Sequence, residues 1–274
     1  MKRILTFILT LTLALSFCVN SFAAATTATA SKTQTGTSEA QTDTSKTQAG
    51  TSEAQTDTSK VQAGASYGIS NLSGAQDIVA ESAVVMDANT GTILYGKEAD
   101  TKRYPASITK VMTALLAVEN CKMSDVITYS NAAVNGIEAG SSTAGINVGA
   151  KLTVEDSLYA LMLVSANEAA AAIAEHISGS TTEFAKLMTK RAKELGCTNT
   201  QFKNPHGLPN EEHYTTAHDM GLILKEAMKH EEFRKISGTI SYTLKKSDTL
   251  KDTLELWNHA KILRENSDYY YKYA

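Results

Sequence analysis

Hydrophobic positions divide the chain into three parts with different patterns. Residues 4–19 form a mostly apolar run, residues 24–77 carry few large apolar side chains, and apolar residues recur at regular spacings from Ile78 onward. Such recurrence is typical of helices and strands that pack on a core. We therefore expect one folded domain over residues 78–274, preceded by two segments that add nothing to its core.

The pattern in the folded part predicts strands first, then helices, then a returning strand. Two strands are expected on either side of a turn over residues 87–91, where Asn89 and Gly91 would supply the positive φ that such a turn requires. The predicted strands are 83–86, 92–95 and 239–244, and the predicted helices are 107–119, 153–164, 167–177, 182–195 and 216–230. This order indicates an α+β domain.

The first 23 residues have the features of a secretory signal peptide. Lys2 and Arg3 precede the apolar run, and Ser21-Phe22-Ala23 offers a cleavage site. The run is shorter than a membrane-spanning helix, which disfavours an uncleaved anchor. Cys18 lies where a lipoprotein site would carry its cysteine, but the bulky Phe17 before it disfavours lipidation. We expect an exported protein.

Residues 24–77 predict a disordered linker rich in Thr, Ser and Gln. The sequence of residues 32–45 repeats almost unchanged at 46–59, and no aromatic residue occurs between Phe22 and Tyr67. A solenoid is the competing explanation of such a repeat, but polar residues at nearly every position leave no face to bury. The segment therefore cannot offset its chain entropy by burying apolar surface.

Charge and cysteine content exclude several classes of protein. The 274 residues carry a formal net charge of −3, and removal of Lys2 and Arg3 with the signal peptide leaves a net −5. Nucleic-acid-binding proteins normally carry a basic face, so we expect no nucleic-acid partner. Cys121 and Cys197 are the cysteines that remain, too few for a disulfide scaffold or a thiolate zinc site. A disulfide between them is possible, although the sequence cannot pair them.

Ser107-Ile108-Thr109-Lys110 is a candidate nucleophile and base. Residues three apart share one face of a helix, so the amine of Lys110 can reach the hydroxyl of Ser107. A buried lysine loses its proton more easily and can activate a serine, and N–H groups at a helix start can stabilise a developing oxyanion. The competing interpretation makes Ser107 a helix N-cap and Lys110 a solvated residue.

Ser165-Ala166-Asn167 is a second candidate group, because it interrupts two apolar helices. The break is expected to expose two short polar side chains between buried helices. Ser165 could relay a proton to a leaving amine, and Asn167 could hold a substrate amide. Capping of the second helix is the alternative, since Ser and Asn are favoured at helix starts.

A histidine-containing segment raises the question of a metal. His206, His213, His218 and Asp219 lie close together in the sequence, but they lack the spacing of known zinc-binding motifs. Histidines that line a cleft or the surface are the commoner outcome. We therefore predict no metal and no cofactor.

Three long segments resemble the serine D-alanyl-D-alanine carboxypeptidases, which are low-molecular-mass penicillin-binding proteins of the β-lactamase-like fold. The segments are YPASITKVMTALLAVE, LTVEDSLYALMLVSANEAAAAIAEHI and NPHGLPNEEHYTTAHDMGLI. The family's motifs are S-x-x-K, an S-x-N-type triplet and K-T-G. The likeness runs from about residue 78 to the end.

The resemblance implies a role for each candidate residue. Ser107 would attack the peptide carbonyl before the terminal D-alanine of a peptidoglycan stem peptide and form an acyl-enzyme, with Lys110 taking its proton. Ser165 would deliver a proton to the departing D-alanine, and Asn167 would hold the substrate backbone. β-Lactam antibiotics would be trapped on Ser107. The enzyme would act in cell-wall synthesis and remodelling, on the outer side of the cytoplasmic membrane.

The chain departs from the family in its third motif. K-T-G does not occur, and the last glycine is Gly238. Against the family pattern, this implies a catalytic domain truncated before K-T-G, without the C-terminal strands of the sheet and without one oxyanion-hole donor. We expect such a chain to fold poorly on its own and to have little or no carboxypeptidase activity. Membrane association would need a C-terminal region that this chain lacks.

Two other functions remain open. A non-catalytic remnant would bind wall peptides or a partner without turnover. A β-lactamase is the weaker alternative, because Ser165-Ala166-Asn167 lacks the central Asp of the class A triplet and no Glu-x-x-Leu-Asn loop occurs.

Overall fold

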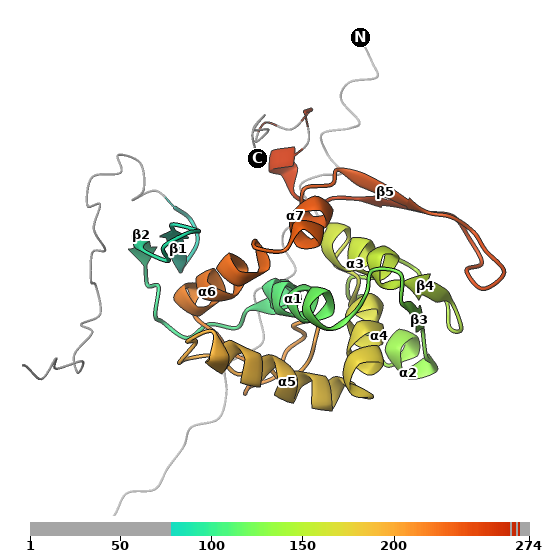
Figure 1. Cartoon of the computed structure of the whole chain (residues 1–274), viewed down its shortest axis with the longest axis horizontal. Helices are drawn as coiled ribbons and strands as arrows, with labels where there is room; N and C mark the ends of the chain where they lie inside the picture. The colour runs from blue at the N-terminus through green and yellow to red at the C-terminus, as the bar shows by residue number, and fades with distance from the viewer. Residues whose placement is uncertain (1–77, 264, 267, 269–274) are drawn as a thin grey trace, which may run out of the picture. The chain divides into compact units, whose positions relative to one another are not determined.

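Three helices that pack on one another form the centre of the fold (Figure 1). The computed structural model describes residues 78–263, 265, 266 and 268, so the predicted signal peptide and linker lie outside the described residues. The central helices are α1 (Lys110–Asn120), α3 (Val154–Leu163) and α4 (Asn167–Ser178). In α4, Ala169 to Ala172 and Ala174 are all buried. Their small side chains let the neighbouring helices approach closely.

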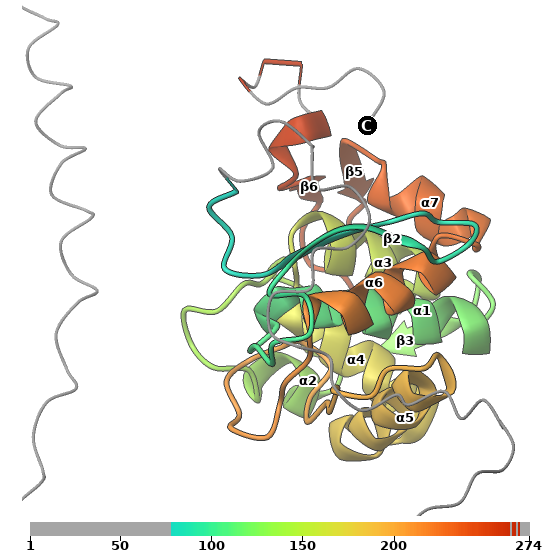
Figure 2. The ribbon, with the colours of Figure 1, turned by 90° about the vertical axis from the view of Figure 1, so that its left-hand side faces the viewer.

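Further helices cover this centre from several sides (Figure 2). These are α2 (Asn131–Asn135), α5 (Thr181–Glu194), α6 (Ala217–Ala227) and α7 (Glu231–Ser237). Helix α6 packs on α1, α2 and α5 pack on α4, and α7 packs on α3. Arg191 of α5 joins three helices, because its guanidinium donates three hydrogen bonds of 2.6, 3.0 and 3.2 Å to the carboxylate of Glu119 and lies 3.6 Å from that of Glu226.

The strands of the described residues form three separate antiparallel pairs. These are β1 (Ala83–Met86) with β2 (Ile93–Lys97), β3 (Val126–Thr128) with β4 (Lys151–Thr153), and β5 (Ser241–Leu244) with β6 (Leu254–Trp257). A stacked pair of rings, Tyr159 and Tyr242, with centroids 3.7 Å apart, fixes β5 on α3. The arrangement confirms the expected mixture of helices and strands, with a partial sheet.

The predicted helices are confirmed, with two differences. The helix expected at 107–119 begins as a 3-10 helical turn, η2 (Ala106–Thr109), and continues as α1. The helix expected at 216–230 corresponds to α6, which ends at Ala227, and the following helix α7 was not predicted. A second 3-10 turn, η3 (Lys261–Leu263), follows β6. No helix in the described part of the chain is long and apolar enough to cross a membrane.

The turn between β1 and β2 differs from its prediction in one residue. Gly91 has a φ of +81°, but Asn89 does not take a positive φ. The carboxylate of Asp87 instead accepts hydrogen bonds from the N–H groups of Asn89, at 3.1 Å, and Thr90, at 2.7 Å. A side chain that bonds the backbone two and three residues on can form the turn without a second left-handed residue.

Candidate active site

Ser107 and Lys110 meet across one turn at the start of α1. Lys110 Nζ lies 3.3 Å from Ser107 Oγ. Ser107 is exposed, whereas Lys110 is only 3% exposed. The structure therefore brings together the two groups that the spacing predicts. The N-cap interpretation of Ser107 and the solvated interpretation of Lys110 are wrong, because Ser107 makes no capping hydrogen bond and Lys110 is buried.

Burial sets the proton affinity of Lys110. Its amine donates a hydrogen bond of 2.8 Å to the carbonyl oxygen of His206. Burial lowers the pKa of Lys110 to about 8, and the negative charge of Glu168 acts in the opposite direction. A lysine with this pKa holds a substantial fraction of neutral amine near neutral pH, as a base toward Ser107 requires.

Ser165 approaches Ser107 from the junction of α3 and α4. Its hydroxyl donates to Ser107 Oγ at 3.1 Å. The backbone of Ser165 has a φ of +59°, a left-handed conformation that is costly for a residue with a side chain. Ser165, Ser107 and Lys110 thus form one chain of polar contacts, from hydroxyl to hydroxyl to amine.

Asn167 is the first residue of α4 and is 3% exposed. The prediction that the helix break exposes this side chain is wrong, because the segment around Ser142 covers the start of α4. Asn167 donates its backbone N–H to the carbonyl of Ser142 at 3.0 Å. Ala166 is the N-cap and α4 has no side-chain cap, so the capping interpretation of Ser165 and Asn167 is also wrong.

The loop over residues 204–209 forms a wall of the site. Asn204 organises it, because its side-chain oxygen accepts the N–H groups of His206 and Gly207 and its amide donates to the carbonyl of Leu208. Gly207 has a φ of +87° and lies directly against the backbone of Ala106, the residue before Ser107. Sequence reasoning missed this loop as a partner of Lys110. The glycine within Pro-His-Gly-Leu-Pro was the available signal.

His213 anchors the same loop to the turn that carries Ser107. The ring is 2% exposed. Its Nδ1 accepts the N–H of Lys203 at 3.2 Å, so its Nε2–H donates to Thr109 Oγ1 at 2.8 Å. Burial lowers the pKa of both His206 and His213 to about 4. Both rings are therefore neutral at physiological pH and act as structural hydrogen-bonding groups.

The structure does not gather the four residues of the metal question into one site. His218 contacts Asp100 at 2.9 Å, and Asp219 accepts hydrogen bonds from Thr200 and Asn199. Among the described residues, the two groups with ligand atoms within 4.8 Å of one another lie elsewhere: Cys121, Asp125 and His176, and Glu119, Glu226 and His230. Cys121 and Cys197 are both free thiols.

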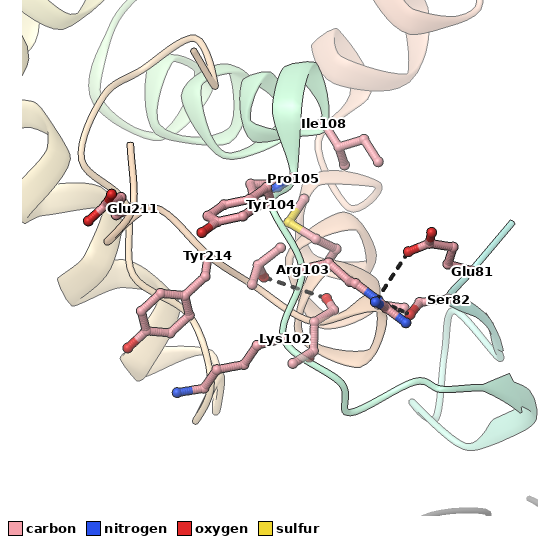
Figure 3. Close-up of a pocket in the computed structure, with 13 residues that line it drawn as sticks. Glu81, Ser82, Lys102, Arg103, Tyr104, Pro105, Ile108, Glu211 and Tyr214 are labelled. Atoms are coloured by element: carbon pink, nitrogen blue, oxygen red, sulfur yellow. Dashed lines mark hydrogen bonds and ion pairs between the residues drawn. The ribbon is translucent and has the colours of Figure 1, made fainter. Parts of the chain in front are cut away.

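A cavity of about 670 Å³ borders the Ser107 turn through Pro105 and Ile108 (Figure 3). Arg103 lies on one side, donating to Ser82 at 3.0 Å and pairing with Glu81 at 3.2 Å. The other walls of the cavity include two tyrosines, a cation and a carboxylate: Tyr104, Tyr214, Lys102 and Glu211.

Comparisons with known proteins point to one family. Residues 69–270 match the family described as D-alanyl-D-alanine carboxypeptidase. The chain is 42% identical over 177 residues to the D-alanyl-D-alanine carboxypeptidase DacF of Bacillus subtilis, covering 63% of this chain and 45% of that protein. It is 34% identical over 198 residues to the D-alanyl-D-alanine carboxypeptidase of Streptomyces K15, covering 68% of each.

Solved structures agree with this match. A variant of the Streptomyces K15 DD-transpeptidase superposes with a TM-score of 0.63 at 33% identity, over 69% of this chain and 77% of that one. Penicillin-binding protein 5 from Haemophilus influenzae gives 0.60 at 31% identity, over 67% and 53%. The fold is thus the β-lactamase-like fold of these proteins. The chain spans less than half the length of DacF. On its sequence match and its fold, the chain belongs to the D-alanyl-D-alanine carboxypeptidase family.

Proposed function

We propose that this chain carries the nucleophile, base and proton relay of a serine D-Ala-D-Ala carboxypeptidase that acts on peptidoglycan stem peptides and binds penicillins. The polar chain from Ser165 through Ser107 to Lys110 carries the proposal. Its two contacts, of 3.1 and 3.3 Å, are short enough for proton transfer after modest closure. Membership of the family supports the substrate class.

The reaction divides into acylation and deacylation. Ser107 Oγ forms a bond to the carbonyl carbon before the terminal D-alanine, and its proton passes to the neutral amine of Lys110. As the tetrahedral intermediate collapses, the C–N bond breaks and the proton held by Lys110 passes through the Ser165 hydroxyl to the amine of D-alanine. Water then adds to the acyl carbon, the ester C–O bond breaks, and a proton from the water returns to Ser107 Oγ. The shortened stem peptide leaves as a carboxylic acid. In a β-lactam the bond that breaks belongs to a ring, so the leaving amine stays attached and the acyl-enzyme persists.

Asn167 and the cavity beside the Ser107 turn complete the proposed site. Asn167 lies two residues after Ser165, and its amide is the group proposed to hold the substrate backbone. The cavity, with Lys102, Glu211 and two tyrosines in its wall, offers space for parts of the stem peptide away from the cleaved bond. A position outside the cytoplasm, on the cell-wall side, is supported by the signal-peptide pattern of residues 1–23.

A second candidate function is binding without turnover. Wall peptides would then occupy the same site without release of D-alanine.

Labelling with a fluorescent penicillin, followed by a denaturing gel, tests the proposal. We expect a covalent signal on the wild-type chain, none on Ser107→Ala, and an unchanged signal on Ser241→Ala, an exposed serine in β5. Release of D-alanine from a D-Ala-D-Ala peptide, assayed in parallel, separates the two candidates. A wild-type chain that is not labelled and releases no D-alanine contradicts the catalytic role of Ser107 and favours binding without turnover.

A further inference from the structure

Glu168 is a buried carboxylate that the proposed mechanism does not use. It follows Asn167 in the first turn of α4 and is 2% exposed. A buried charge is strongly unfavourable unless hydrogen bonds and an opposite charge compensate it. An acidic residue at this depth, next to a proposed substrate-binding residue, therefore needs a physical explanation.

One oxygen of Glu168 receives all its hydrogen bonds. Oε1 accepts from the Thr143 hydroxyl at 2.6 Å and from the N–H groups of Ala144 at 2.7 Å, Gly145 at 3.1 Å and Ile146 at 3.4 Å. Oε2 has no hydrogen-bond partner among the described residues. Oε1 therefore acts purely as an acceptor, as a carboxylate oxygen does.

These bonds hold the loop over residues 142–146 to the start of α4. Asn167 bonds the carbonyl of Ser142, and the adjacent Glu168 bonds the next four residues. The two anchors are consecutive in the chain and are separated from Ser165 by Ala166 alone. The loop, Asn167 and the Ser165 backbone thus form one connected unit whose centre is the Glu168 side chain.

Glu168 is also the negative charge that acts on Lys110. The other groups that face the Lys110 amine carry no negative charge: the hydroxyl of Ser107, and the carbonyl of His206 from the 204–209 loop. The rings of His206 and His213, which pack around this loop, are neutral. When Ser107 gives its proton to Lys110, a buried ammonium forms. Glu168 is not in direct contact with this ammonium, so its carboxylate acts on it as a nearby charge rather than as an ion-pair partner.

We propose that Glu168 is a positioning residue for the serine–lysine pair: its carboxylate fixes the 142–146 loop against the start of α4 and stabilises the ammonium form of Lys110. This inference rests on the proposed function, in which Lys110 is the base. The proposal gives Glu168 two roles. The structural role needs only an acceptor oxygen, whereas the electrostatic role needs the negative charge.

Glu168→Gln distinguishes these roles, because the amide keeps the acceptor oxygen and loses the charge. Without Glu168 the ammonium of Lys110 is less stable, so we expect the pH midpoint of Ser107 acylation by a β-lactam to fall by about half a unit or more. The weaker base should also lower the plateau rate at high pH by about three- to tenfold. An unchanged midpoint and plateau in a folded variant would overturn the proposal.

Two variants serve as matched controls. Glu175→Gln removes the same charge from the same helix two turns further on, and we expect it to leave the midpoint unchanged. Thr143→Val removes a hydrogen bond to Oε1 without a change of charge. We expect it to lower the melting temperature and leave the pH midpoint in place. A midpoint that moves as far in Glu175→Gln as in Glu168→Gln would contradict a specific role for Glu168.

If Glu168→Gln does not fold, a second substitution still tests the proposal. Lys110→Met combined with Glu168→Gln removes both charges, and the proposal predicts that the double variant folds and melts cooperatively. A double variant that stays unfolded would overturn the charge pairing.

If the proposed function is wrong, the effect of Glu168 on Lys110 can still be measured directly. If wild-type Ser107 is not acylated at any pH, the midpoint is measured by ¹³C NMR titration of Lys110 with labelled lysine. A lower Lys110 midpoint in Glu168→Gln then supports the charge pairing even without acylation, and an identical midpoint overturns it.

Discussion

Gly207 lies so close to Ala106 that a Cβ atom on Gly207 would overlap the Ala106 carbonyl oxygen. Ala106 itself has a φ of +48°, and Gly207 has a φ of +87°. The loop that accepts the Lys110 hydrogen bond is thus in direct backbone contact with the turn that presents Ser107.

Gly207→Ala is expected to move this loop away from the Ser107 turn. The His206 carbonyl would then leave Lys110, and a displacement of about 1 Å at a catalytic group can lower a rate by about 10²-fold. Gly196→Ala is the matched control, since Gly196 has a φ of +89° but no atom within 4 Å of an added Cβ. It should lose about 1–2 kcal/mol of stability from backbone strain alone and keep wild-type acylation. Stopped-flow acylation by a β-lactam measures the rate, and the melting temperature measures the stability. Equal acylation rates in Gly207→Ala and Gly196→Ala would show that the contact between Gly207 and Ala106 does not matter for acylation.

The acylation rate is expected to rise with pH through a midpoint of about 8. Burial lowers the Lys110 pKa to about 8, and the neutral amine is the form that accepts the Ser107 proton. At pH 7 this shift raises the neutral fraction about 300-fold over that of a lysine with the ordinary pKa of 10.5. Acylation rates measured between pH 6 and 10 test this. A flat profile would exclude Lys110 as the base, and Lys110→Arg, which stays charged, should not be acylated at a measurable rate.

Ser165 is expected to show a conflict between stability and activity. Its left-handed backbone strains any residue with a Cβ, by about 1–2 kcal/mol. Ser165→Gly relieves that strain, and Ser165→Ala does not, while both remove the hydroxyl that contacts Ser107. We expect both variants to acylate slowly and to similar extents, with the glycine variant melting at the higher temperature. Equal melting temperatures would show that the backbone at this position is not strained.

Acid should destabilise the protein as the pH falls from 6.5 toward 4. His213 is buried and neutral with its pKa lowered to about 4, whereas its unfolded-state pKa is near 6.5. The unfolded state therefore binds a proton first as the pH falls, which removes up to about 3 kcal/mol of stability per histidine with such a shift. Denaturant unfolding of the wild-type chain and of His213→Asn at pH 7 and pH 4.5 measures this. The variant should lose less stability between the two pH values, and an equal loss would assign the acid sensitivity to other groups.

Long periodic elements and spaced motifs were predictable from the sequence, whereas several short elements were not. The apolar periodicity located α1, α3, α4 and α5 to within a few residues. Strands β3, β4 and β6 contain three or four residues and were missed, whereas β1 and β5, equally short, were found within longer β-branched or turn-bounded segments. The short helices α2 and α7, of five and seven residues, were missed as well.

The side chains of the candidate site could be predicted from the sequence, but its main-chain contacts could not. The spacing of Ser107 and Lys110 and the position of Ser165 follow from helix geometry and from the family resemblance. The Lys110 partner is a main-chain carbonyl, which every residue possesses, so the sequence signals the close approach of the loop through Gly207 but not which carbonyl Lys110 contacts. The burial of Asn167 and Glu168 depends on a loop over 20 residues earlier in the chain, which local patterns do not reveal.

The buried alanines of α4 make the helix packing around it rigid. Alanine has no side-chain rotamer to change, so the helices packed on Ala169 to Ala172 cannot adjust to a ligand by repacking at that surface. Under the proposed function, accommodation of ligands of different size would therefore fall to the segments around Ser107 that are not packed on these alanines, such as the 142–146 and 204–209 loops. The distances among the reacting atoms should then stay the same for all such ligands.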